Sequence, residues 1–450
     1  MTRAESHPAD VPPLPADAPT ASTAIPSLSR RRWFQFRLRT LMALMVVVSI
    51  LLAAFAWRLQ RARRQAEAVR VLRALDDCVA YESQWSMDRG IFQFDPGRDS
   101  SIPAFFLTWL GTDFFHDADQ VRQIRRQPRS QAEIEQFWNA VVRLPALESL
   151  DVEGSWMYDR GFAGLRGSRH LRRVFLRDAL ITNEELTTVG SMMRLEAFHA
   201  AHWPPSSSDP ILPIDDQGIV QLKGLSSLRE FSLSHSRATP GGMRALVEDH
   251  PKLVELQLRG PSLTDEVAAA AKDLPNLVRL GFYDSEISDQ GLAYLAQLPN
   301  LDSLTVEGEG ITDQGLSHLR QMHNLGALGI RKTSLRGSGL KHLCEMPSLG
   351  SLWLEHNPLT DDGLKYVEDF SRLSVLDLGD TEITDTGIIE FKLPPKLQVL
   401  QLYDTQITDR ALEALAKHGQ LTMLDVRRTK VTDAGVAAFK NARPKCRLQH

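Results

Sequence analysis

Residues 301–322 read LDSLTVEGEGITDQGLSHLRQM, and this stretch holds one full unit of a repeat that decides the fold. The leading leucine of the unit recurs at twelve positions along the chain, and nine of the eleven steps between them are 24 residues long. The other two steps are 33 residues after Leu195 and 25 residues after Leu228. A spacing kept over so many units indicates one structural element that is repeated and stacked. The twelve leucines are Leu147, Leu171, Leu195, Leu228, Leu253, Leu277, Leu301, Leu325, Leu349, Leu373, Leu397 and Leu421.

Two different periods are combined within each unit. In L-x-x-L-x-L the last two leucines are two residues apart, which is the period of a strand, whereas G-L-x-x-L has the spacing of a helix face. The unit is therefore predicted to be strand, turn and helix. A single unit of 24 residues cannot bury its leucines, so neighbouring units must stack around one continuous core. The sequence predicts an α/β solenoid of about 12 repeats.

The centre of the unit is itself repeated as Ile-(Ser/Thr)-Asp, at Ile287-Ser288-Asp289, Ile311-Thr312-Asp313, Ile383-Thr384-Asp385 and Ile407-Thr408-Asp409. This pattern resembles the leucine-rich repeat of the I-T-D-x-G-L type, and the resemblance implies a leucine-rich-repeat solenoid with a helix on the convex side. The early units depart from it, because Ile181-Thr182-Asn183 lacks the glycine and Ala201–Pro213 is an insertion.

An uncharged apolar stretch of eighteen residues, TLMALMVVVSILLAAFAW, runs from Thr40 to Trp57. As a helix it spans about 27 Å, enough for the hydrocarbon core of a bilayer. Ala54-Phe55-Ala56 has the small-x-small pattern of a signal peptidase site. About forty residues precede the apolar stretch, however, so we expect a retained single-pass anchor. Arginines flank both ends, and the positive-inside rule selects neither orientation.

The order of segments also resembles that of the membrane-anchored leucine-rich-repeat proteins of planctomycete-type bacteria. The likeness rests on a Pro-rich tail, FQFRLRTLM, one apolar helix, RRQAEAVRVLRAL, WLGTDFF and then the repeats. It implies a bacterial inner-membrane protein and adds little about activity. We expect five parts: a disordered tail (1–29), an Arg-flanked anchor (30–64), a juxtamembrane helix with a cap region (65–143), the solenoid (144–441) and a C-terminal cap or tail (442–450).

Composition excludes several classes of protein. The 450 residues are 43% hydrophobic and 24% charged with a formal net charge of -4, which argues against collagen, a fully disordered chain and a multi-pass membrane protein. Cys78, Cys344 and Cys446 lie far apart, so they favour neither a disulfide framework nor a cysteine zinc site. The arginines flank an apolar span rather than a basic domain, so we expect contact with anionic lipid headgroups and no nucleic-acid partner.

The repeated aspartates and glycines and two histidines could carry chemistry, but each has a simpler structural explanation. The repeated aspartates, Asp265, Asp289, Asp313, Asp361, Asp385, Asp409 and Asp433, are expected to cap helices rather than to bind metal, and the glycines that follow them to let helix approach sheet. His199 and His202 are expected in a solvated loop rather than in a metal site. No triad, P-loop or metalloenzyme motif stands out. We therefore expect no enzyme activity, no cofactor and no metal.

The surface with most information is the concave sheet. Leucines point into the core at alternate positions, so the residues between them face outward. In the C-terminal half these include a tryptophan, two tyrosines and several arginines, which are residue types favoured at binding hot spots. The alternative is that cross-strand stacking of the aromatics only stabilises the sheet. The predicted partner-binding residues are Arg279, Tyr283, Arg331, Trp353, Glu355, Tyr403 and Arg427.

The sequence thus predicts a non-enzymatic, membrane-anchored module that binds a protein partner through the concave face of its solenoid. The alternative is a structural component that spaces or scaffolds the cell envelope without a specific ligand.

Overall fold

The computed structural model describes residues 38–75, 77–81, 85–88, 91–94, 110, 112–115, 118–123, 130–154, 162–179, 181–201 and 214–450. It divides into two compact units, Met1–Trp57 and Arg58–His450. The expected disordered tail (1–29) and residues 202–213 of the predicted insertion lie outside the described residues.

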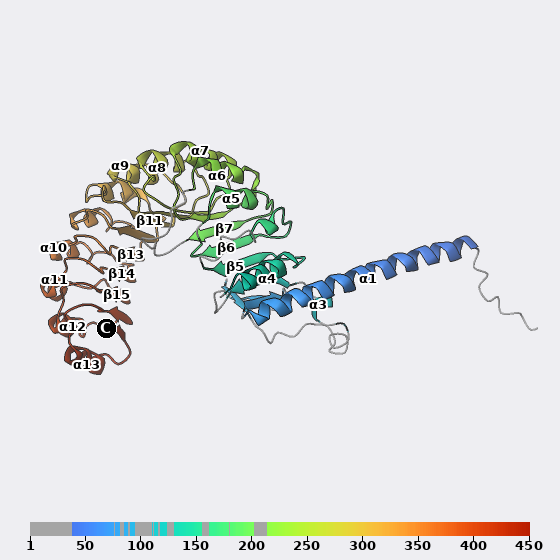
Figure 1. Ribbon diagram of the computed structural model, residues 1–450. Helices are drawn as coiled ribbons and strands as arrows, with labels where there is room; N and C mark the ends of the chain where they lie inside the picture. Colours follow the sequence, from blue (N-terminus) through green and yellow to red (C-terminus); the bar gives the residue numbers. More distant parts are fainter. Residues whose placement is uncertain are drawn as a thin grey trace, which may run out of the picture. The chain divides into compact units, whose positions relative to one another are not determined.

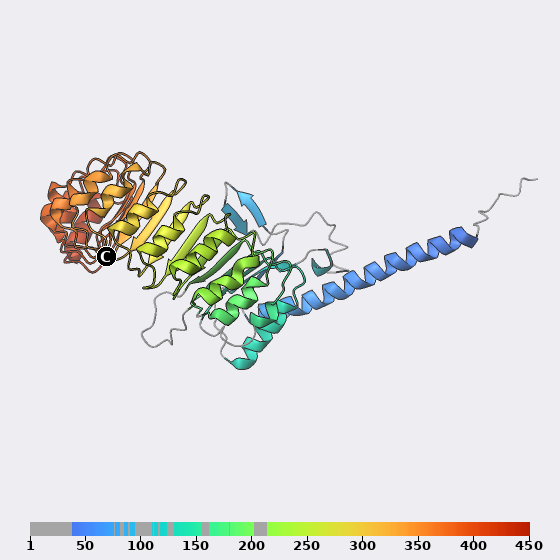
Figure 2. The same ribbon diagram turned by 90° about the horizontal axis from the view of Figure 1, so that it is seen from above.

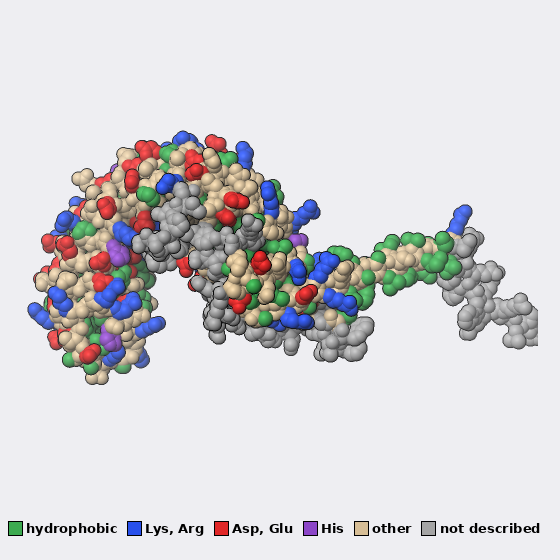
Figure 3. Space-filling view, in the orientation of Figure 1, with side chains coloured by type: hydrophobic (Ala, Val, Ile, Leu, Met, Phe, Trp, Pro, Cys, Tyr) green, Lys and Arg blue, Asp and Glu red, His purple; other side chains and the backbone are tan. Residues whose placement is uncertain are grey.

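One long helix, α1 (Leu38–Ala74), contains both the predicted anchor and the predicted juxtamembrane helix. No glycine or proline occurs between its ends, so nothing in the sequence interrupts it. Its most apolar window has a mean hydropathy of 2.4 and is not buried. Large apolar side chains before Trp57 are exposed, and they cover this part of the helix in Figure 3. By length and composition, the helix can cross a membrane.

The second part of α1 belongs to the unit Arg58–His450 and buries one face. Ala62, Gln65, Ala68, Val69 and Leu72 are buried at spacings of three and four residues, and the last three of them belong to the main hydrophobic core. The buried Gln65 donates a hydrogen bond of 3.0 Å from Nε2 to the Asp113 carboxylate in α3 (Thr112–Phe115). This second part of α1 is thus part of the packing at the start of the solenoid.

A 15-stranded sheet forms the scaffold of this unit. β1 (Asp77–Tyr81) pairs antiparallel with β4 (Ala118–Gln123), and from β4 onward every pairing is parallel, while β2 (Trp85–Asp88) and β3 (Ile91–Phe94) form a separate hairpin. The sheet therefore extends beyond the twelve predicted repeats by two strands, β1 and β4, at the N-terminal end and by one strand at the C-terminal end. The remaining strands are β5 (Ser149–Glu153), β6 (Arg173–Arg177), β7 (Ala197–Ala201), β8 (Glu230–Leu233), β9 (Glu255–Arg259), β10 (Arg279–Tyr283), β11 (Ser303–Glu307), β12 (Ala327–Arg331), β13 (Ser351–Trp353), β14 (Val375–Asp377), β15 (Val399–Gln401), β16 (Met423–Asp425) and β17 (Arg447–Gln449).

Short helices form a second layer on the convex side of the sheet (Figures 1 and 2). Several are 3₁₀ rather than α. In η6 the sequence Arg336-Gly337 replaces Thr-Asp, so the capping hydroxyl is missing and Gly337 has φ 109°. The helices are α4 (Gln131–Val142), η3 (Phe162–Leu165), α5 (Asn183–Gly190), α6 (Asp216–Val220), η4 (Gln221–Gly224), α7 (Pro240–Asp249), α8 (Asp265–Ala271), α9 (Asp289–Leu295), η5 (Gly315–Gln321), η6 (Ser338–His342), α10 (Asp361–Leu364), α11 (Asp385–Glu390), α12 (Asp409–Leu415) and α13 (Asp433–Ala442).

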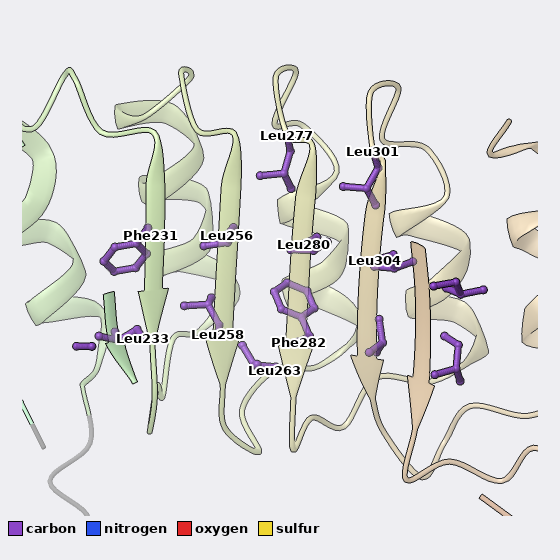
Figure 4. Packing of buried hydrophobic residues seen from close by; sticks show 14 of the residues in the cluster. Phe231, Leu233, Leu256, Leu258, Leu263, Leu277, Leu280, Phe282, Leu301 and Leu304 are labelled. Atoms are coloured by element: carbon purple, nitrogen blue, oxygen red, sulfur yellow. The ribbon is translucent and has the colours of Figure 1, made fainter. Parts of the chain in front are cut away.

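The core is the continuous leucine stack that the repeat predicts. Leu256, Leu280, Leu304 and Leu328 are register partners on four neighbouring strands, and each is at most 3% exposed. Figure 4 shows the first three of these pointing to the same side of the sheet, with Phe231 and Phe282 filling larger spaces. The predicted leucine-rich-repeat solenoid behind one apolar helix is confirmed.

The Thr-Asp-x-Gly centre of the repeat joins consecutive units. In α11 the Thr384 hydroxyl caps its own helix by accepting a hydrogen bond from the Thr386 amide. Asp385 instead accepts hydrogen bonds from the amide (2.7 Å) and the hydroxyl (2.6 Å) of Thr408 in the next repeat. The predicted hydrogen bonding of the aspartate to backbone amides is present. The aspartate makes these bonds to the following unit, however, and not to its own helix. Equivalent bonds join Asp265 to Ser288, Asp289 to Thr312, Asp361 to Thr384, and Asp409 to Thr432.

The glycine of the motif makes room for this bond. A Cβ on Gly315 would lie 2.2 Å from the Asp289 carboxylate, and one on Gly435 would lie 2.1 Å from the Asp409 carboxylate. At these two positions glycine leaves room for the carboxylate of the preceding unit, rather than for the sheet as expected. The Thr432 hydroxyl and then its amide hold the pKa of Asp409 below its usual value, which shows that the ionised form is favoured.

Removing one of these inter-repeat bonds has a measurable cost. Asp385→Ala is expected to lower the free energy of unfolding by about 1–3 kcal/mol, because two charge-assisted hydrogen bonds are lost. Asp433→Ala is the matched control, because within the described residues no hydrogen bond joins the Asp433 carboxylate to another repeat. Denaturant unfolding of both variants measures the difference. Equal stabilities would contradict the bridging role.

Candidate interaction surface on the concave sheet

The strand register places the outward residues in columns across the sheet. Arg279, Ser303, Ala327, Ser351 and Val375 are successive register partners, and the next two outward positions of each repeat follow the same order. All seven predicted partner-binding residues lie on or directly after these strands. Tyr283, Trp353, Tyr403 and Arg331 are half-buried, Arg279 and Arg427 are exposed, and Glu355 is buried.

The three predicted arginines pair with carboxylates of the sheet itself. Arg279 Nε lies 2.5 Å from Glu255, and Arg331 Nε lies 2.6 Å from Glu355. Arg427 holds both oxygens of Asp425 from the same strand end. These bonds use three guanidinium groups that the sequence predicted to bind a partner. These arginines neutralise buried acids of the sheet, Arg279 and Arg331 between neighbouring repeats and Arg427 within its own strand end.

The two tyrosines lie over glycines of the sheet. A Cβ on Gly281 would lie 2.7 Å from the Tyr283 ring, and one on Gly379 would lie 2.2 Å from the Tyr403 ring. The Arg259 guanidinium lies 5.1 Å from the ring centroid of Tyr283, and that of Arg428 lies 5.8 Å from Tyr403. Burial raises the pKa of both phenols. These rings therefore cover bare backbone and carry a cation of the same chain, as the sheet-packing alternative predicts.

Trp353 has a different environment. It is the last residue of β13 and is the register partner of Gly329 on one side and Asp377 on the other. Across the described residues, no lysine or arginine head lies over its ring, in contrast to Tyr283 and Tyr403. It is half-buried, so part of the indole remains open to solvent.

Buried acidic residues lie along the concave face of the sheet. Only one of them, Glu355, was among the predicted partner-binding residues. Among the described residues, five carboxylates are more than nine-tenths buried: Glu255, Glu307, Glu355, Asp377 and Asp425. Four have a basic partner, because Lys332 Nζ lies 3.2 Å from Glu307 and the arginines above hold three more. Burial, and then the charge of Glu355, raises the pKa of Asp377 to about 7. Burial also raises the pKa of Glu355.

A second column of polar residues was not predicted. It lies at the position directly after the third outward residue of a repeat. Lys332, Asp284, His356, Asp380 and Arg428 all have φ between 47° and 61°. They pair among themselves, since Lys332 Nζ lies 2.9 Å from Asp284 and His356 Nδ1 lies 2.7 Å from Asp380. Polar side chains at every twenty-fourth position after the strand were the available signal. Asp404 completes the column and pairs with Arg428.

The N-terminal half of the face has its own polar contact. His199 lies in β7, not in the expected loop, and stacks on Phe175 with ring centroids 4.8 Å apart. Its Nε2 lies 3.3 Å from Glu230, and this contact is the main cause that lowers the pKa of that carboxyl. His202, the second histidine of the pattern, lies outside the described residues.

The convex side has a cavity of about 350 Å³ between α10 and α11. Five carboxylates and one ammonium line it, those of Asp361, Asp362, Glu368, Glu382, Glu390 and Lys365. In the part of the chain that the structure describes, no group of three or more His, Cys, Asp or Glu side chains is placed to hold a metal ion.

One comparison with known proteins, that with protein families, agrees with the fold. Residues 373–392 match the leucine-rich-repeat family model. This match lies within a single repeat and covers its strand β14 and its helix α11, including Asp385. A comparison with curated protein sequences finds no match. Among solved structures, the crystal structure of an internalin from Listeria monocytogenes is similar, with 19% sequence identity, 68% of this chain and 87% of that chain covered, and a TM-score of 0.44.

Proposed function

We propose that this chain is a non-enzymatic interaction module, anchored in a membrane by residues 40–57, that binds a protein partner through the C-terminal half of its concave face. The observation that carries this proposal is Trp353, a half-buried indole on the open sheet that lacks the covering cation of the two tyrosines. A large aromatic at the centre of a broad surface is the residue type that anchors protein interfaces.

The same repeat geometry supports a broad contact. The parallel strands present their outward residues as a continuous surface, because successive repeats keep one register from β9 to β17. Around Trp353 this surface offers hydrogen-bonding and charged groups on both sides. The resemblance to membrane-anchored bacterial repeat proteins supports an inner-membrane location.

The alternative function is a spacer or scaffold of the cell envelope. It is favoured by the tyrosines that cover Gly281 and Gly379, and by the arginines that neutralise acids of the same sheet. These contacts stabilise the solenoid without any ligand. They leave Trp353 without a structural partner of this kind within the described residues.

One variant separates the two functions. With a partner isolated on the immobilised full chain in detergent, Trp353→Ala is expected to weaken binding by about 1–4 kcal/mol, because an interface anchor is lost. The free energy of unfolding should change little, because the ring lies outside the leucine core. Calorimetry of binding and denaturant unfolding measure the two quantities.

The control is Lys341→Ala, which removes an exposed side chain of η6 on the convex side. It should change neither quantity. A clear loss of stability in Trp353→Ala, with unchanged binding, would favour the scaffold over the interaction module.

A further inference from the structure

Asp377 is the exception among the buried carboxylates of the sheet. Within the described ranges, Glu255, Glu307, Glu355 and Asp425 each lie within 4.0 Å of a lysine or arginine nitrogen, and Asp377 does not. Asp377 is 5% exposed, and its Oδ1 accepts a hydrogen bond of 2.9 Å from the Gly379 amide. A buried carboxylate without a cation is costly unless it is protonated or a ligand supplies the charge.

The same strand position two repeats later shows what is missing. Asp425 is equivalent to Asp377, and its cation comes from Arg427, two residues further along the chain. At the corresponding place after Asp377 the chain has Gly379, which is covered by the Tyr403 ring. The chain therefore provides the carboxylate and omits the arginine.

Trp353, beside Asp377, also has no lysine or arginine over its ring within the described residues. It is the direct register partner of Asp377, so an uncovered indole and an unpaired carboxylate lie side by side on neighbouring strands. Glu355, two residues after Trp353 and on the same face, is 6% exposed and has an Oε2 atom without a hydrogen-bond partner. Aromatic face, unpaired carboxylate and free carboxylate oxygen together form the environment that a guanidinium or ammonium group prefers.

We propose that an arginine or lysine side chain of the protein partner fills this place, with its charged group at Asp377 and its stem against Trp353. The inference rests on the proposed function and adds the chemistry of the partner's anchor residue. The small exposure of Asp377 means that the flanking side chains change rotamer when the cation enters, as is common at interfaces.

Binding of this cation is coupled to a proton. The charged and titratable groups that act on Asp377 are Glu355, Arg331 and Asp425, and it in turn acts on Tyr403. Burial and the acidic neighbours raise the pKa of Asp377 to about 7, so the group is mostly neutral at pH 6 and mostly ionised at pH 8. A cation binds the ionised form, and we expect its affinity to rise roughly tenfold between these two pH values.

The test uses the full chain in detergent micelles with 5-fluorotryptophan, whose Trp353 signal is assigned by its loss in Trp353→Phe. The probe is N-acetyl-arginine-N-methylamide, and the neutral citrulline analogue is its matched control. The Trp353 ¹⁹F signal is expected to shift saturably with the arginine compound and not with citrulline. Asp377→Asn keeps the shape of the side chain, and should weaken the probe at least fivefold and abolish the dependence on pH.

Equal shifts with the arginine and citrulline compounds, or an unchanged affinity in Asp377→Asn, would overturn the proposal. Unfolding of Asp377→Asn is measured in parallel, and a stability equal to that of the wild type assigns any loss of affinity to the missing charge. A protein partner that binds wild type and Asp377→Asn equally would refute this inference and leave the proposed function intact. If the arginine probe binds but the full chain retains no protein partner, the cation site would stand and the proposed function would be refuted.

Discussion

Replacing Leu328 by aspartate should unfold the repeats on both sides of β12, with a loss of more than about 5 kcal/mol in the free energy of unfolding. Leu328 is fully buried and lies between its register partners Leu304 and Leu352. The substitution removes leucine packing and also places an unpaired charge in a continuous apolar stack. Because each repeat buries its leucines against the next, the damage spreads along the array. Limited proteolysis of the full chain, with cleavage sites identified by mass, measures how many repeats on each side of β12 become unfolded.

The control is Ala327→Asp, which introduces the same charge one residue earlier. Ala327 faces the concave side and is half-buried, so its variant should lose less than about 1 kcal/mol. If Leu328→Asp left the neighbouring repeats as resistant to protease as the wild type, the continuous core would not hold the array together.

The fold could be predicted from the sequence because one physical rule is applied many times. Each L-x-x-L-x-L segment predicts a strand whose leucines meet those of its neighbours, and the register Leu280, Leu304, Leu328 confirms it. The strand β17 was harder to predict, because Arg447–Gln449 contains a single leucine, and the turn and helix pattern of the repeat does not follow it.

The contacts between repeats could be predicted only in part. The periodic aspartates were visible, but a pattern within one unit does not show that Asp385 reaches across to Thr408. The same limit applies to the concave face. Residue type suggested Arg331 and Arg427 as partner-binding residues, whereas both neutralise buried acids, Arg331 that of the next repeat and Arg427 that of its own strand. Trp353 and Asp377 could be singled out only in the structure. Their counterparts Tyr403 and Asp425 each contact an arginine, whereas within the described residues no cation contacts Trp353 or Asp377.

Two arginines in the middle of the apolar helix should release the protein from the membrane. Val47 and Leu51 lie one turn apart in α1, and their side chains are 52% and 63% exposed. On insertion scales an arginine near the centre of a span costs about 2.5–3.5 kcal/mol, so the double variant Val47→Arg/Leu51→Arg loses about twice that amount. We expect the wild-type chain in the carbonate-washed membrane fraction of a bacterial host and the double variant outside it. Val47→Leu/Leu51→Val, which keeps the helix apolar, should behave like the wild type.

The mass of the membrane-bound chain then separates an anchor from a signal sequence. An anchor keeps residues 40–57, and its apolar side chains gain roughly 1.5–3 kcal/mol each for the largest ones on entering lipid, which holds the intact chain in the bilayer. A signal sequence cut after Ala56 yields a chain that begins at Trp57 and lacks every exposed apolar residue from Leu41 to Phe55. Such a chain would be recovered in solution, and its detection as the main species would refute the anchor.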